Sequence, residues 1–426
     1  MSGSVSLQVV NLKQWQQNQE TFVVFKNHQR QFQRLYPRVI QPTYRATNEI
    51  VFVLNSYARD YLNITGLQLF IEIRPTVGGD EDQKFSAYWT FSTAGLIKRF
   101  RFRSGVTDHF DCDNYGKWVW QRLMGHLCKD TRLDEYELFE NAGGSIVEWT
   151  VPAGGGLANT QKFMVPLITP LDNAGYLPMY NLAEQLEFRI ELDTAAEMFS
   201  LRKAPDGAAL AFDYEITDIY LMGDTLTATS GGVLNDTPFR WHDYGVYSRQ
   251  DKFAVGKGTK LNIPYDLKKT SMKDFTSMML TAQTNTAQPF ENCRSIPCPL
   301  SYRFTMGGTP FPIETAVSDK HEQWYYFLKF WHRQDITGDV YPYVVRFGRF
   351  ENDGATATAF GCFWPCLSFE KLDQANWVSG PDTSRYTVIG EFERVEDGPA
   401  DNDRFYTWLR WDKFYNIIGG EVIGEK

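Results

Sequence analysis

Short runs of apolar, β-branched and aromatic residues, separated by turn residues, recur along most of the chain. In the first half they lie at residues 49–54, 67–73, 98–103, 162–168, 186–192 and 214–221. Runs of this length and composition, bounded by Gly, Pro, Asn and Asp, are typical of β-strands. The run at 98–103 alternates strictly, with Arg99, Arg101 and Arg103 on one face and Phe100 and Phe102 on the other. The pattern therefore predicts strands that each bury one face.

A second series of such runs follows a turn-rich stretch from Thr227 to Asp236. Its members lie at residues 260–265, 301–305, 340–347, 359–363, 386–392 and 405–411. The stretch contains Ser230, Gly231 and Gly232 and is the natural boundary between two domains. Each half thus contains strands, a helical insertion and further strands, which is a repeat of architecture rather than of obvious sequence.

A chain built from so many short strands must protect its strand edges. Closing each half into a two-sheet jelly roll covers most of them. We therefore predict an all-β fold of two tandem eight-stranded jelly rolls, with short helical insertions and an N-terminal arm. The predicted limits are 1–45 for the arm, 46–228 for the first jelly roll and 236–426 for the second.

Three segments have a helical rather than an alternating pattern. Residues 112–141 and Ser318–Trp331 are the predicted insertions in the two halves. The third segment, Asn18–Tyr36, lies in the arm, with aromatic residues near one face and Pro37 directly after it. Two interpretations stay open for this segment. It is either a helix that docks on a neighbouring molecule or a helix that packs on its own jelly roll.

Composition agrees with a β-rich protein. Aromatic residues make up 15% of the chain, and 33 Gly and 19 Pro are spread along it. Aromatic side chains fit half-buried pleated surfaces, and Gly and Pro favour turns. No apolar run reaches the roughly 18 residues of a membrane span, and no segment has the pattern of a secretory signal peptide. We therefore expect a protein that is made in the cytoplasm and is not secreted.

The charge is uneven along the chain. The net charge is −9, but residues 1–45 contain six Lys and Arg against Glu20 alone, which is +5 and leaves −14 for the rest. A basic arm on an acidic body favours contact with an anionic partner, although short segments also vary in charge by chance. The candidate contacts in the arm are Lys26, Arg30, Arg34 and Arg38.

The three arginines at 99, 101 and 103 form a second basic stripe. A stripe of this kind suits a nucleic acid or an acidic subunit, and an ordinary solvated strand face presents the same pattern. Proteins whose main task is to bind nucleic acid are usually basic as a whole, and this chain is acidic. Nucleic-acid binding is therefore not expected to be the main task.

The sequence contains none of the common catalytic or nucleotide-binding motifs. Residues 256–259 lack the glycine and lysine placement of a phosphate-binding loop, and neither Gly-x-Ser-x-Gly nor His-Glu-x-x-His occurs. Cysteines at 293, 298, 362 and 366 have spacings near those of a zinc site, but prolines stiffen both pairs, which favours buried thiols. His109, Asp111 and Asp113 alternate and offer either a metal-binding strand face or a solvated loop. We predict no catalytic residue, no metal, no cofactor and no enzymatic activity.

Three stretches carry a family resemblance. Residues 165–180 place a Leu-Pro pair after an apolar turn, and residues 304–313 contain a Gly-x-x-x-Pro element before the aromatic helix. Residues 367–384 contain a Glu-Lys pair followed by Ser-Gly-x-x-Thr. In this order and spacing the chain resembles the double jelly-roll major capsid proteins of small eukaryotic DNA viruses, namely virophages, polinton-like viruses and adintoviruses. The resemblance covers about residues 45–424.

The resemblance implies a structural protein of a virus particle. Three copies would form a pseudo-hexagonal capsomer, and capsomers would tile an icosahedral shell. The implied partners are the other two copies, neighbouring capsomers and minor capsid or penton proteins, with the arm directed at the genome or at an inner membrane. No small-molecule substrate is implied. The alternatives are a carbohydrate-binding jelly-roll protein, which would be a monomer or dimer, and a minor capsid protein of the penton or spike type, which would have one jelly roll and form pentamers.

Overall fold

The structure is a computed structural model of the chain. It describes residues 10–11, 28–54, 61–77, 83–89, 91, 93–127, 146–151, 160–202, 212–228, 239–254, 256–282, 293–295, 300–312, 315–319, 322–323, 325–326, 330, 365–370, 377–378, 380–395, 403–418 and 421–425.

The first half contains two main antiparallel sheets. One has the order β2 (His28–Leu35), β13 (Phe212–Ala228), β4 (Tyr61–Val77) and β9 (Gln161–Val165), and the short β10 (Tyr176–Pro178) pairs with the same edge of β4 as β9 does. The other has the order β3 (Glu49–Val53), β11 (Leu186–Leu192), β6 (Ile97–Ser104) and β7 (Thr107–Asp113). Numbered along the chain, these eight strands have the orders 1-8-3-6 and 2-7-4-5.

The second half repeats this arrangement. Its first sheet has the order β14 (Phe239–Phe253), β23 (Asp403–Ile418), β16 (Met272–Ala282) and β20 (Cys366–Ser368), with β17 (Cys293–Ser295) also on β16 and β24 (Glu421–Glu425) on β23. Its second sheet has the order β15 (Lys260–Tyr265), β22 (Val388–Arg394), β18 (Leu300–Met306) and β19 (Thr309–Phe311). The orders are again 1-8-3-6 and 2-7-4-5. Each half is therefore an eight-stranded jelly roll, and the predicted double jelly-roll fold is confirmed.

Smaller elements fill the connections. The three-stranded sheet β12 (Phe199–Arg202), β5 (Gln83–Trp89) and β8 (Ile146–Val151) extends the first half, and β1 (Val10–Asn11) pairs with β21 (Trp377–Val378). Helical elements in the described part of the chain include η2 (Thr93–Leu96), α2 (Tyr115–Leu127), η3 (Met179–Asn181) and α4 (Ala195–Met198). Of these, α2 matters most for the site, because it follows β7 and reaches the second half.

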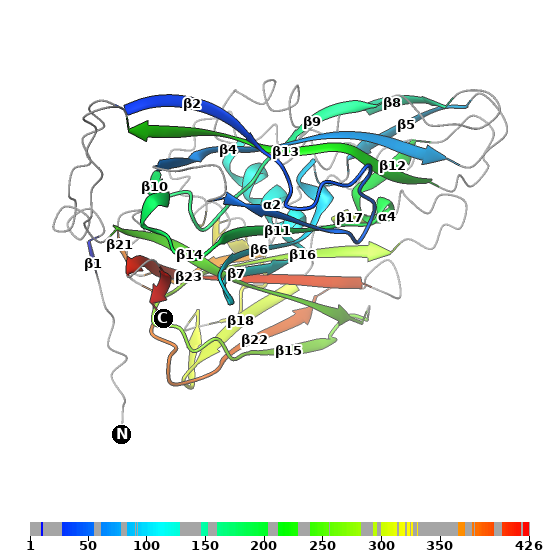
Figure 1. Cartoon of the computed structure of the whole chain (residues 1–426). Helices are drawn as coiled ribbons and strands as arrows, with labels where there is room; N and C mark the ends of the chain where they lie inside the picture. The colour runs from blue at the N-terminus through cyan, green and yellow to red at the C-terminus, as the bar shows by residue number, and fades with distance from the viewer. Residues whose placement is uncertain are drawn as a thin grey trace.

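The four main sheets lie one beneath another. Figure 1 shows β2, β13 and β4 at the top, then β11, β6 and β7, then β14, β23 and β16, and finally β18, β22 and β15 at the bottom. Stacked sheets of this kind pack through the apolar side chains on their facing surfaces. The layers define two internal sandwiches and one junction between them.

Each sandwich has an aromatic core. In the first, Phe188 of β11 lies 5.1 Å from Phe100 and 5.9 Å from Phe102, measured between ring centroids. In the second, the rings of Phe275 of β16 and Phe304 of β18 are 4.7 Å apart. Phe100 and Phe102, which form the apolar face of the run at 98–103, are fully buried. The predicted division of that strand into an apolar inner face and a basic outer face is therefore confirmed.

The first core extends into the second half. Trp241 of β14 and Tyr406 and Trp408 of β23 belong to the same continuous cluster of buried side chains as the first sandwich, and each is at most 2% exposed. The interior of the second sandwich forms a separate cluster. The junction between the jelly rolls is therefore packed like a protein interior.

The helix predicted over Asn18–Tyr36 is wrong where the structure describes it. Residues 28–35 form β2, which pairs with β13 over eight residues, from Leu35 opposite Leu221 to His28 opposite Ala228. The spacing of its aromatic residues suggested a helical face, but Phe32 is 65% exposed and only Leu35 is buried. Sheet pairing outweighed the local pattern. Residues 18–27 lie outside the described part of the chain.

The other two helical predictions are confirmed in part. Helix α2 covers residues 115–127 of the predicted insertion at 112–141, but residues 112–113 belong to β7. The described residues between 322 and 330 are helical, whereas residues 318–319 are not. The predicted strands at 340–347 and 359–363 and the boundary residues 229–236 lie outside the described part. Among the helices that the structure describes, none has the length and apolarity of a membrane span.

Candidate functional site: the charged faces and the junction of the jelly rolls

Three of the four predicted arm residues contact the first jelly roll itself. Arg30 forms an ion pair with Asp224 of β13, and the guanidinium group of Arg34 lies 4.7 Å from the ring centroid of Tyr220. Arg38, just after β2, places Nη1 3.3 Å from Oε1 of Glu187. The fourth residue, Lys26, lies outside the described part of the chain. A role of these residues inside a shell stays a prediction.

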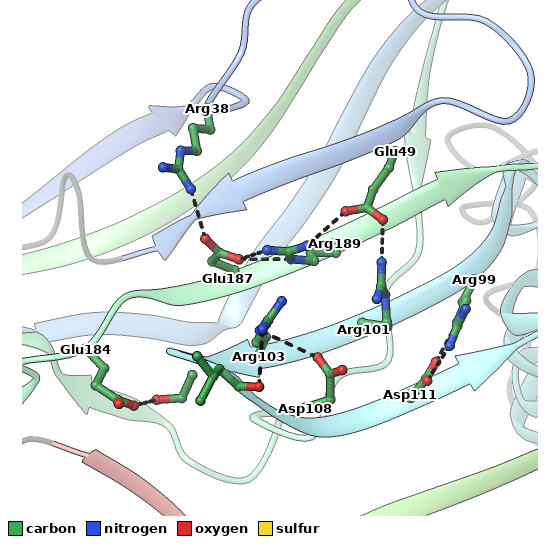
Figure 2. A network of polar contacts seen from close by, with 12 residues as sticks. Arg38, Glu49, Arg99, Arg101, Arg103, Asp108, Asp111, Glu184, Glu187 and Arg189 are labelled. Carbon is green, nitrogen blue, oxygen red and sulfur yellow. Dashed lines mark hydrogen bonds and ion pairs between the residues drawn. The ribbon is translucent and has the colours of Figure 1, made fainter.

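The arginine stripe of β6 is part of a network that we call the charged ladder, which crosses β3, β11, β6 and β7 (Figure 2). Its ion pairs are Arg99–Asp111 at 2.6 Å, Arg101–Glu49, Arg103–Asp108 at 4.0 Å, Arg189–Glu49 at 3.2 Å, Arg189–Glu187 at 2.7 Å and Arg38–Glu187 at 3.3 Å. Each arginine of the stripe thus faces a carboxylate of its own chain. The ladder leaves little unbalanced positive charge for a nucleic acid, whose binding depends on neutralising phosphates.

The helix α2 carries a buried ionic contact across the junction. Nη2 of Arg122 lies 2.9 Å from Oδ1 of Asp274 on β16, and Nε of Arg410 on β23 donates to both oxygens of the same carboxylate at 2.9 and 3.0 Å. Burial alone would raise the pKa of Asp274, but the two guanidinium groups hold it below its usual range. Burial and the nearby Arg410 lower the pKa of Arg122 to about 10. The carboxylate therefore stays ionised between two cations.

A second buried cation of α2 points to the same junction. Nζ of Lys117 lies 3.5 Å from Asp193 and 3.2 Å from Glu197, and Glu197 also pairs with Arg404 of β23. Burial opposes the charged form of Lys117, but the two carboxylates outweigh it and raise its pKa above the ordinary value. Nearby, Nε2 of Gln121 donates to the backbone carbonyl of Ser277 at 2.6 Å. Residues 117–122 of α2 thus connect the first jelly roll to β16 and β23.

A third cluster lies on the second jelly roll. Asp412 accepts hydrogen bonds from Ser271 at 2.8 Å and contacts Nε2 of His242 at 2.8 Å. Lys273 lies 3.7 Å from Asp412 and 3.2 Å from Glu370. Burial raises the pKa of Glu370 to about 7, against the opposing effect of Lys273. Glu370 is therefore a titratable group near neutral pH.

The segment with His109, Asp111 and Asp113 is a strand and not a solvated loop. His109 is 6% exposed and packs against Phe102 and Tyr415, and burial, with Lys413, lowers its pKa to about 4. Asp111 is engaged by Arg99 in the charged ladder. Among the residues that the structure describes, no group of three or more His, Cys, Asp and Glu is placed to hold a metal. The alternation of His109, Asp111 and Asp113 therefore reflects the pairing of β7 with β6 in a hairpin.

The cysteines divide into two sets. Cys366 is buried with a free thiol, as is Cys112, and burial raises the pKa of both. This agrees with the buried thiol expected at Cys366. Cys298 and Cys362 and the side chain of Cys293 lie outside the described part of the chain, so the zinc hypothesis receives no geometry from the structure.

A pocket of about 400 Å³ opens where β7 meets β14 and β23. Its lining includes three carboxylates, Asp108, Asp111 and Asp113, and three cations, Arg99, Lys269 and Lys413. Asp111 and Arg99 neutralise one another, Lys413 donates to the backbone carbonyl of His109 at 2.6 Å, and the amide of Asp113 donates to Ser248 at 2.7 Å. These groups bind one another or the backbone at the junction between the two jelly rolls. The pocket is therefore better described as a packing gap than as a catalytic centre.

Sequence reasoning found the arginine stripe and the helical insertion but missed the ionic junction. Arg410 lies in the strand predicted at 405–411, whereas Asp274 lies in β16, which the sequence pattern did not predict, and neither residue belongs to a motif. The signal available was weak: Lys117 and Arg122 fall five residues apart in a helical stretch of mostly apolar residues. Buried cations in such a stretch require carboxylate partners, but the sequence does not name them.

No protein-family model matches the sequence, and no curated protein matches it. The fold does match solved virus structures. A chain in the structure of the Sputnik virophage is 10% identical with a TM-score of 0.58, over 96% of this chain and 90% of that one. The quasi-atomic model of the PBCV-1 virus capsid gives 11% identity and a TM-score of 0.56, over 96% and 99% of the two chains. The mavirus major capsid protein gives 12% identity and a TM-score of 0.52, over 92% and 90%.

These TM-scores, all above 0.5, show a shared fold despite the low sequence identities. The predicted resemblance to double jelly-roll major capsid proteins is confirmed at that level, because each match spans nearly the whole of both chains. The match includes the second half as well as the first.

Proposed function

We propose that this chain is the major capsid protein of an icosahedral virus. The observation that carries the proposal is the double jelly roll itself, matched from end to end by capsid structures. A single jelly roll occurs in proteins of many functions, so one copy would say little about the task. Two copies with the same strand order in one chain, joined by a buried junction, are a far narrower architecture.

The geometry suits a rigid tile. The buried contacts of α2 with β16 and β23, together with the ion pair between Glu197 of α4 and Arg404 of β23, hold the two jelly rolls in one fixed arrangement. The chain therefore presents both jelly rolls as a single body. Three such bodies around a threefold axis would place six jelly rolls in a ring, which gives a nearly hexagonal capsomer. Capsomers would then contact one another and minor capsid or penton proteins in the shell of the virion. The task is mechanical and needs no catalytic residue or cofactor.

The division of the chain follows from the same proposal. We place the start of the first jelly roll at His28, because β2 belongs to its sheet, and the start of the second at Phe239, where β14 begins. Residues before His28 would then form the arm. Lys26 would face the shell interior, and Arg30, Arg34 and Arg38 would lie at the base of the arm.

The mass of the purified protein in solution tests the proposal. Multi-angle light scattering should give three times the mass of one chain, and negative-stain images of the same sample should show hexagonal outlines or closed shells. A protein that stays monomeric at micromolar concentration and never assembles would contradict the proposal and point to the carbohydrate-binding alternative. Pentamers would point to the penton alternative instead.

A further inference from the structure

The sheet of β2, β13 and β4 lies at the top of Figure 1. Its outer surface carries exposed and half-buried aromatic, methionine and arginine side chains. Phe32 of β2 is 65% exposed and Met222 of β13 is 36% exposed. The rings of Phe70 and Tyr220 are stacked with their centroids 5.4 Å apart, and Arg34 covers Tyr220. We define the aromatic face as the following side chains: Phe32, Arg34, Tyr36, Phe70, Tyr220 and Met222.

Its composition is that of an interface centre rather than of an ordinary surface. Aromatic residues, Met and Arg are enriched at the centres of protein interfaces, and charged residues form their rims. Around this face the ion pairs Arg30–Asp224 and Lys162–Glu72 supply such a rim. Contiguous exposed apolar surface on a soluble protein usually marks a contact site.

The internal repeat identifies a covered counterpart of this surface. The sheet β14-β23-β16 occupies in the second jelly roll the place that β2-β13-β4 occupies in the first. On its outer surface Met278, Tyr406 and Trp408 are at most 1% exposed. The same position in the fold is thus buried in one half of the chain and open in the other.

What covers the counterpart is β7 and α2 of the first jelly roll. Nε1 of Trp408 donates to the carbonyl of Asp113 at 3.5 Å, and α2 contributes its bonds to Ser277 and Asp274. In the second jelly roll, β19 and the helical residues that follow it stand at the place of β7 and α2. There Tyr325 is 59% exposed.

We propose that the aromatic face of one copy is covered by the second jelly roll of the next copy, through β19 and the helical segment that contains Glu322 and Tyr325. This contact would repeat between chains the one that β7 and α2 make within the chain. It rests on the proposed capsomer and names the two surfaces that build it. Because the surfaces differ, the contact is heterologous, and three copies close it into a ring. The charges agree, since Arg34 lies on one surface and Glu322 on the other.

The double variant Phe32→Asp with Met222→Asp tests the proposal in the full-length chain. Both side chains are exposed within a single chain, so the double variant should still fold and unfold in a cooperative thermal transition, while light scattering shows monomers in place of trimers. The matched control is Val106→Asp, an apolar residue that is 85% exposed at the β6–β7 turn, which should stay trimeric. A trimeric double variant would overturn the inference and leave the capsomer proposal intact. A monomeric wild type would remove the capsomer proposal, and this inference with it.

Photo-cross-linking identifies the occupant directly. Benzoylphenylalanine replaces Phe32 in one preparation, which is mixed during assembly with an isotope-labelled wild-type chain, and cross-linked peptides are identified by mass spectrometry. Cross-links from position 32 to labelled peptides within residues 300–330 are expected. Cross-links to labelled residues 28–36 or 212–228 would mean that two aromatic faces meet each other, and that result would overturn the proposal.

Discussion

Single residues at the junction decide how the two jelly rolls are held. Asp274 is 4% exposed and is bound by Arg122 from one jelly roll and Arg410 from the other. An intact buried ion network is weak evidence for stability, because desolvation offsets the attraction of its charges. Removal of one member is different, since it leaves the remaining charges buried without a partner. The network therefore matters chiefly because its breakage is costly.

The variant Asp274→Asn should destabilise the chain by about 3–5 kcal/mol, because two buried guanidinium groups would lose their counter-charge. Denaturant unfolding of the two proteins measures the difference. The matched control is Glu391→Gln, which removes a half-exposed carboxylate paired with Arg303 and should cost about 1 kcal/mol or less. Equal losses of unfolding free energy in both variants would show that the buried pairs of Asp274 stabilise the chain no more than a surface ion pair does.

Glu370 should make stability depend on pH near neutrality. Its pKa is raised from an ordinary 4.5 to about 7 in the folded chain, so the folded state binds this proton more tightly than the unfolded state does. The stabilisation is complete below about pH 4.5 and is lost as the pH rises through 7. The full effect is on the order of 3 kcal/mol.

The variant Glu370→Gln keeps the hydrogen-bonding shape and cannot ionise. Measured from pH 4.5 to 8, the melting temperature of the wild type minus that of the variant should fall as the pH rises. The charged groups that act on this carboxyl, Lys273, Asp412 and Asp274, are present in both proteins, so the difference isolates Glu370. A difference that stays constant across this range would contradict the raised pKa.

The charged ladder shows what sequence can and cannot provide for single side chains. Alternation placed Arg99, Arg101 and Arg103 on one face of a strand, and the structure agrees. The role of these arginines depends on carboxylate partners that lie far away in the sequence. Glu49, for example, reaches Arg101 only because β3 and β6 flank β11 in the sheet. Charge along the chain therefore suggested a basic surface, whereas charge in space is nearly balanced.

At the level of elements, strands with a clear period of two were predicted well and β2 was not. Strand β11 was placed at its observed limits, and β15 likewise. Strand β2 has polar residues on both faces, so its own sequence offers no period that would favour a strand. Its conformation comes from pairing with β13, a strand almost two hundred residues later in the chain. Information of that kind is absent from a local window.

Truncation at two points separates the arm from the sheet. Removal of residues 1–27 should leave a folded trimer, because the described contacts it deletes are limited to the two-residue pairing of β1 with β21, and it should reduce shell assembly by removing basic residues. Removal of residues 1–43 deletes β2 as well and bares the edge of β13. The predicted arm limits of 1–45 would place this cut outside the first jelly roll, and the pairing of β2 with β13 argues against that.

Solubility, thermal melting and light scattering of the two truncations provide the measurement. The longer truncation should aggregate or melt at least 10 °C lower, roughly the effect of losing a strand worth a few kcal/mol. If both truncations form trimers of equal stability, β2 is dispensable for the first jelly roll. If the shorter one assembles shells as well as the full chain does, the arm has no assembly role.

For the whole molecule, the architecture was predictable and the junction was not. The spacing of strands and turns, together with the family resemblance, predicted two jelly rolls in tandem, and the matching strand orders of the two halves agree with it. The seam depends on contacts such as Gln121 with Ser277 and Arg122 with Asp274, which join residues about 150 positions apart. Nothing in either segment alone indicates its partner.

The continuous core across the seam has a consequence for the two halves as separate chains. Trp241, Tyr406 and Trp408 of the second jelly roll lie in the first core, and Lys117 and Arg122 of the first rely on side chains at or beyond the seam. Residues 28–228 expressed alone would expose this surface to water with its cations only partly paired. We expect that fragment to aggregate, and we expect residues 229–426 co-expressed with it to recover a soluble one-to-one complex held by the same contacts.

Size-exclusion chromatography of the single and paired fragments provides the measurement. If residues 28–228 are a soluble monomer with one cooperative melting transition, the seam joins two independent domains, and the rigidity required of a capsomer tile must come from contacts between copies.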